Sequence, residues 1–152
     1  MNANARTAPP LFVAVAFALA FAGVARAQTA PAADPGAPPP PRVQSAGGIE
    51  YVSGGAGEEA RQQIVALSAG FLLRIVFSVT GGAYAVADRV ELAGAGGRLL
   101  AVDAAGPLLA IKVPPGDYFI DVTAGGKSER RPIRVGSQPV TLNWRLPDEA
   151  KR

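Results

Sequence analysis

The feature that most constrains the fold is a period-two alternation of apolar residues that begins at Phe71 and recurs to the end of the chain. Its clearest stretch is residues 71–80, where every second residue is apolar: Phe71, Leu73, Ile75, Phe77 and Val79. Successive side chains of a strand point to opposite faces, so this pattern predicts a strand with one buried face.

Turns that contain Gly or Pro interrupt the alternation at near-regular intervals. They divide it into seven predicted strands, at residues 71–80, 86–92, 99–104, 109–113, 118–123, 133–135 and 140–146. No helical segment separates these strands, which argues against a parallel sheet. The sequence therefore predicts a mainly β fold: an antiparallel, seven-stranded, Ig-like Greek-key sandwich over residues 71–147, followed by a tail at 148–152.

One short helix is predicted before the sandwich. The apolar residues Ala60, Ile64, Leu67 and Phe71 fall on a single stripe at helical spacing, and Glu58 and Glu59 lie in the first turn. Residues 48–70 are therefore expected to form a short strand and this helix. The glycine-rich segment before the helix could suit an anion, but the two glutamates would repel a phosphate, so we interpret it as a plain loop.

The N-terminal segment has the pattern of a targeting signal. Arg6 precedes an uncharged apolar run over residues 11–25, and Ala25-Arg26-Ala27 is a small-x-small cleavage box. These features predict a secretory signal peptide over residues 1–27 that is cleaved near Ala27. The alternative, a transmembrane anchor, needs about 20 apolar residues. We expect a periplasmic or secreted protein with no stable membrane span after cleavage.

Residues 28–47 are rich in Pro and Ala and have little apolar surface to bury. We expect a spacer there, because such a composition does not offset the entropy lost on ordering. A proline-rich ligand for an aromatic groove is the alternative interpretation.

Composition narrows the function. The chain has 15 basic and 12 acidic residues, and removing Arg6 and Arg26 with the signal leaves 13 against 12. Nucleic-acid binding is therefore not expected, because it needs a marked positive excess. The chain has no His and no Cys, which removes the commonest general base, the thiol nucleophile and disulfides. We expect stability to come from the apolar core alone.

The segment Ile111-Lys112-Val113-Pro114-Pro115-Gly116-Asp117-Tyr118 joins an apolar strand to a Pro-Gly corner and an alternating strand. With the turns around it, it resembles the carboxypeptidase regulatory-like (transthyretin-like) β-sandwich domains of exported bacterial proteins, over residues 71–146. The chain as a whole looks like small exported proteins of proteobacteria that carry a single domain of this kind. The resemblance implies a non-catalytic accessory module.

Four residues of this region have predicted structural roles. Pro115 ends a ladder because proline lacks the N–H donor, and Gly116 permits a tight reversal. The Tyr118 ring is expected inside, with its hydroxyl bonded to backbone at a corner of the sandwich. Trp144, the only Trp, shares the apolar face of the last strand and should be buried between the sheets.

The sequence contains only weak matches to phosphate-binding, metal-binding and catalytic motifs. Asp121 to Ser128 ends like a phosphate-binding loop, but it lacks the first Gly and leads into a strand, so we expect a hairpin. The scattered Asp residues have no metal-ligand spacing. Lys112 or Lys127 with Ser128 would need desolvation to act as a catalytic pair. We expect no enzyme, no cofactor and no metal.

The basic residues Lys127, Arg130, Arg131 and Arg134 cluster around Pro132. Proline and cationic side chains are typical of a guarded edge strand, and Lys127, Arg130 and Arg134 are also candidate contacts for an anionic partner. The leading hypothesis is a non-catalytic exported β-sandwich module for binding or scaffolding in the cell envelope. Its partner would be an envelope protein or a polysaccharide. The alternative is a periplasmic chaperone or assembly factor that acts by edge-strand pairing.

Overall fold

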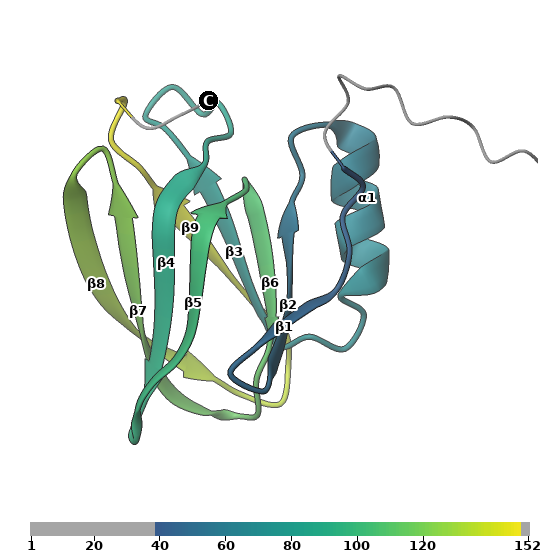
Figure 1. Cartoon of the computed structure of the whole chain (residues 1–152), viewed down its shortest axis with the longest axis vertical. Coiled ribbons are helices and arrows are strands. Elements are labelled where there is room, and N and C mark those ends of the chain that lie inside the picture. Colours follow the sequence, from purple (N-terminus) through teal and green to yellow (C-terminus); the bar gives the residue numbers. More distant parts are fainter. Residues whose placement is uncertain (1–38, 150–152) are drawn as a thin grey trace, which may run out of the picture. The chain divides into compact units, whose positions relative to one another are not determined.

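The computed structural model describes residues 39–149, so the predicted signal peptide and most of the expected spacer lie outside the described residues. The described part has nine strands and one helix (Figure 1). In chain order these are β1 (Gln44–Ala46), β2 (Ile49–Gly54), α1 (Glu58–Leu67), β3 (Leu73–Ser78), β4 (Ala87–Gly94), β5 (Gly97–Ala105), β6 (Leu108–Lys112), β7 (Gly116–Ala124), β8 (Lys127–Val135) and β9 (Val140–Arg145).

The strands form two sheets, one of five strands in the order β1-β2-β6-β3-β9 and one of four in the order β5-β4-β7-β8. The mainly β character is thus confirmed, with two corrections. The seven strands predicted after residue 71 are present, but β1 and β2 join them, so that the two sheets have nine described strands in all. Strand β9 runs parallel to β3, although every other pair is antiparallel. The chain reaches β9 from β8, which belongs to the other sheet, so no hairpin fixes its direction.

A shared apolar core joins the two sheets. Leu73, Ile75 and Phe77 of β3 lie in one cluster with residues of the four-stranded sheet, namely Val90, Leu92, Leu100, Val102, Ile120 and Val122. The alternation that begins at Phe71 is confirmed, because its five apolar members are all buried. The regular strand is shorter than predicted, at Leu73–Ser78.

The N-terminal hairpin of β1 and β2 corrects the expected spacer boundary. Residues 44–46 lie inside the predicted 28–47 spacer, yet they pair with residues 49–51 across a turn in which Gly47 and Gly48 both have positive φ. The strand β2 then pairs with β6. The short strand predicted near residue 49 is therefore part of the five-stranded sheet rather than an appendage. The three residues of β1 show no alternation of apolar and polar residues, because an edge strand this short buries little side-chain surface.

The helix α1 lies on the outer side of the five-stranded sheet, beside β2 and β6 (Figure 1). A second cluster holds it there, formed by Val52, Ile64, Phe71, Leu108 and Ala110. The predicted stripe is only partly correct, because Ile64 and Phe71 are buried but Leu67 is 40% exposed. The helix ends at Leu67, and the buried residue one turn after Ile64 is Ser68. Within residues 39–149 no helix is long and apolar enough to cross a bilayer.

Candidate functional site

The Pro-Gly-x-Tyr segment forms the predicted corner between β6 and β7. The Tyr118 hydroxyl donates a 2.7 Å hydrogen bond to the carbonyl oxygen of Pro114, and the Tyr118 ring is buried. The predicted packing of Tyr118 is therefore confirmed, and it fixes the start of β7. Gly116 is the first residue of β7 and has no positive φ, and a Cβ there would make an ordinary contact of 3.4 Å with the Tyr118 ring, so the tight reversal predicted at this glycine is not borne out.

The three candidate anion contacts lie on β8, which is an edge of the four-stranded sheet as predicted. Each has an acidic neighbour. Arg134 donates to both carboxylate oxygens of Asp117 at 2.8 and 3.4 Å, Arg130 lies 3.8 Å from Asp121, and Lys127 lies 3.9 Å from Glu149. The hydrogen bond from Arg134 holds the pKa of the Asp117 carboxyl below its ordinary value. These acids weaken the positive field that an anionic partner would meet.

Arg131 behaves differently from its basic neighbours because it turns toward the space between the sheets. Its guanidinium lies 4.3 Å from the centroid of the Trp144 ring, and its Nε donates a 2.7 Å hydrogen bond to Glu129. In the register of β7 and β8, Arg131 faces Ile120, and Glu129 faces Val122. Sequence reasoning missed this placement, although Ile133 and Val135 share the parity of Arg131 and mark the inward face.

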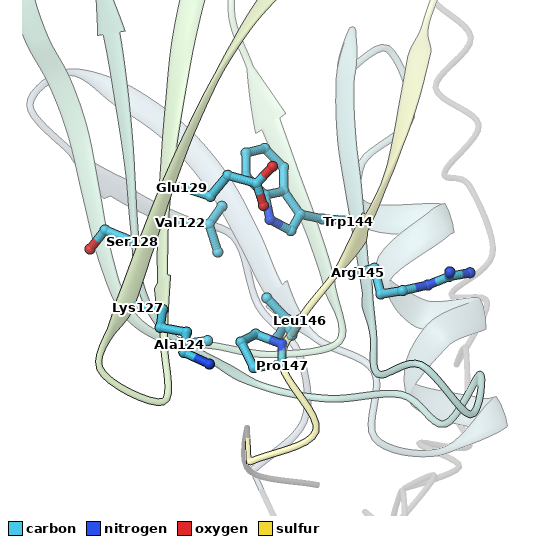
Figure 2. Close-up of a pocket in the computed structure, with 9 residues that line it drawn as sticks. All are labelled: Val122, Ala124, Lys127, Ser128, Glu129, Trp144, Arg145, Leu146 and Pro147. Carbon is cyan, nitrogen blue, oxygen red and sulfur yellow. The ribbon is translucent and has the colours of Figure 1, made fainter.

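A pocket of about 310 Å³ opens beside this ion pair, between β9 and the hairpin that joins β7 to β8 (Figure 2). Its apolar wall consists of Val122, Ala124, Trp144, Leu146 and Pro147, and Lys127 and Glu129 stand at its rim. The side chains of Ser128 and Arg145 point away from it (Figure 2). The Ser128 hydroxyl instead lies 2.8 Å from that of Thr123 on the outer face. The lining therefore suits an apolar group with a polar attachment.

The backbone beside the pocket is a free sheet edge. The amides of Val140 and Leu146 donate to the carbonyl oxygens of Leu72 and Ser78, both at 2.7 Å. In a parallel ladder alternate residues bond to the same neighbour, so the even-numbered residues of β9 face β3. The N–H and C=O groups of Thr141, Asn143 and Arg145 consequently point to the other side, where the described residues supply no strand.

The two edges that flank the pocket differ in their protection. Strand β8 has Pro132 at its middle and carries several charged side chains, which are features that discourage pairing with another strand. Strand β9 has no proline between Val140 and Arg145, and its inward residues are apolar. The unguarded edge is therefore the one that contributes Trp144 to the pocket.

The segment that resembles a phosphate-binding loop is a hairpin, as predicted. Ala124 pairs with Lys127 across a two-residue turn in which Gly125 and Gly126 both have positive φ. The Gly125 amide donates a 2.9 Å hydrogen bond to the Asp88 carboxylate, so this donor is already satisfied by an acidic side chain.

The acidic side chains are spread over the part of the chain that the structure describes. No group of three acidic side chains there could hold a metal ion. Glu129, the acid at the pocket rim, accepts its hydrogen bond from Arg131. What the geometry offers is an apolar cavity next to a free strand edge.

No family model matches the chain, and no curated protein matches it either.

Proposed function

We propose that the chain is a non-catalytic binding module of the cell envelope, and that its partner occupies the pocket between β8 and β9. The observation that carries the proposal is the coincidence of a pocket of about 310 Å³, lined by both apolar and polar residues, with the point where each sheet ends in an edge strand. Ligand sites are usually concave, apolar and equipped with a few polar groups, which is the composition of this lining.

The fold assignment that accompanies this proposal is an Ig-like or transthyretin-like Greek-key sandwich of the carboxypeptidase regulatory-like kind. Its support is the shared core of the two sheets and the corner at which Tyr118 bonds to Pro114. The N-terminal pattern supports export with cleavage near Ala27, and thus a periplasmic or secreted location. Mass spectrometry of the mature N-terminus tests the export step, and an intact segment 1–27 would contradict it.

Between the two partner classes, an envelope protein fits better than a polysaccharide. The pocket wall includes five apolar residues, and the basic residues of β8 already face Asp117, Asp121 and Glu149. A polyanion would have to compete with these carboxylates. Binding through the pocket should therefore persist at high salt, whereas ionic contact with a polymer would weaken as salt rises.

An assembly factor that pairs briefly with client strands is the second candidate, favoured by the free edge of β9. It differs from a scaffold in releasing its client, so its complexes would be transient.

Site-specific photocrosslinking tests the proposal. A photoreactive residue replaces Lys127 at the pocket rim, and in a control chain it replaces Asp103, an exposed residue on β5, the opposite edge of the four-stranded sheet. In envelope extract we expect a defined adduct from position 127 that survives high salt, and none from position 103. Equal labelling at both positions, or no adduct at all, would contradict the proposed function.

A further inference from the structure

The free edge of β9 and the pocket lie side by side. A ligand could therefore bond to the β9 backbone and fill the pocket at the same time. A strand placed beside β9 would find three residues with free backbone groups, Thr141, Asn143 and Arg145. Alternate side chains of that strand would point between the sheets, toward the pocket. The remaining side chains would lie on the outer face beside those of Thr141, Asn143 and Arg145, which are exposed.

We propose that the occupant is an extended peptide segment of a partner protein, which adds to the edge of β9 and inserts one large apolar side chain into the pocket. This inference rests on the proposed function and names the partner's chemistry. The main-chain bonds would supply affinity and the pocket would supply specificity, as in other cases of strand addition.

The size of the cavity fits an aromatic side chain. An apolar cavity of about 150 Å³ can hold benzene, and this pocket measures about 310 Å³. The indole of Trp144 turns its nitrogen-bearing edge toward the cavity, next to Leu146 and Pro147 (Figure 2). Val122 and Ala124 form the facing wall. Because Trp144, Leu146, Val122 and Ala124 are each at most 2% exposed, an inserted ring would reach this apolar surface only after the rim side chains Lys127 and Glu129 turn aside.

The charge of Arg145 indicates which residue should follow the inserted ring in the partner segment. Arg145 is exposed on the outer face and makes no ion pair with any residue in 39–149, whereas its outward-facing neighbours on β9 are uncharged. The residue of the added strand that lies opposite Arg145 would share its face. The partner segment should thus carry an acidic residue adjacent to the aromatic one, within an otherwise alternating β-prone sequence.

The test uses synthetic heptapeptides in which Val and Thr alternate, with a central inward Phe followed by an outward Glu. Binding is followed by the fluorescence of Trp144, the only Trp of the chain, and by calorimetry. Two further peptide series carry N-methyl groups on alternate amides, so that one series blocks bonding toward β9 and the other does not. We expect saturable binding, and a loss of roughly twofold to tenfold per methyl group in one series only.

Variants of the chain test both halves of the site. Asn143→Pro removes an amide that faces the free edge, whereas the matched Asn143→Ala keeps that amide and removes only the side chain. Ala124→Leu fills part of the pocket. We expect Asn143→Pro to weaken binding of the Phe peptide much more than Asn143→Ala does, because the alanine variant keeps the amide. We expect Ala124→Leu to weaken the Phe peptide more than a peptide with Ala at that position. Circular dichroism checks that each variant folds, and the methylated peptides need no variant.

Two results would overturn the inference. One is the absence of saturable binding by any peptide of this design. The other is binding that responds to Ala124→Leu but equally to both methylated series, which would indicate a ligand held by the pocket without strand addition. In that second case an adduct from position 127 would still support the binding module. Failure of the photocrosslink would count against the proposed function itself.

Discussion

Replacing Trp144 with Ala should remove a large share of the stability of the domain. The indole is 1% exposed and packs in the core that joins the two sheets, and Arg131 stacks on its ring at 4.3 Å. Truncating a buried Trp costs about 3–5 kcal/mol, through lost burial and the cavity that remains. Here the cavity would extend an existing pocket of about 310 Å³ that the surrounding strands already leave open, so collapse would recover little. A domain of this size has only about 5–15 kcal/mol of unfolding free energy.

The matched control is Arg145→Ala, one residue along β9, whose side chain points to the outer face (Figure 2). Its effect should stay below about 0.5 kcal/mol, as is usual for an exposed residue without special contacts. The assay is urea unfolding followed by circular dichroism, because Trp144→Ala removes the only fluorescent indole. If Arg145→Ala proved as destabilising as Trp144→Ala, the strand register would be wrong by one residue and the faces of β9 would be inverted.

Three further predictions concern the corner, a close approach and an ion pair. Tyr118→Phe should lower the unfolding free energy by about 1 kcal/mol, since it removes the bond to the Pro114 carbonyl, and an unchanged urea midpoint would contradict that role. Gly106→Ala should destabilise strongly, because its Cβ would lie 2.6 Å from the Gly54 Cα, whereas Gly96→Ala meets nothing within 4 Å and should fold normally. The pKa of the Asp117 carboxyl should lie below the ordinary value of an Asp because Arg134 hydrogen-bonds to it, and NMR titration should show the ordinary value in Arg134→Gln. Because folding lowers the pKa of Asp117, the ion pair with Arg134 slightly stabilises the folded chain at any pH above the pKa of the unfolded state. This stabilisation is lost as the pH falls through the pKa of the folded state. A pKa of Asp117 above the ordinary value would contradict this prediction.

The strands after residue 71 could be predicted because each buries one face against the opposite sheet. The positions from Phe71 to Val79 and the pair Trp144 and Leu146 are buried as their alternation requires. The corner at Tyr118 could be predicted because Pro114 and Pro115 lack the N–H donors that would continue the ladder. In these segments local pattern and tertiary packing favour the same conformation.

The features that escaped prediction depend on tertiary neighbours. Strand β1 is an exposed edge of three residues and needs no apolar alternation. Strand β9 enters its sheet from the other sheet, and such a crossing leaves the strand direction open. The sequence placed Arg131 among the cationic residues that protect the β8 edge from pairing, yet its guanidinium lies over the Trp144 ring. The pocket itself arises from side chains of β7, β8 and β9, which only the folded arrangement brings together.

Amide hydrogen exchange, measured in the free chain and in the chain bound to its photocrosslinked partner, shows whether a partner strand pairs with β9. In the free chain the amides of Asn143 and Arg145 should exchange quickly and that of Trp144 slowly, because only the even-numbered residues of β9 bond to β3. In the complex the account predicts new protection at Asn143 and Arg145, with Arg130 on β8 unchanged. Protection that appears on β8 or on the outer face of the four-stranded sheet, while Asn143 and Arg145 still exchange quickly, would contradict it.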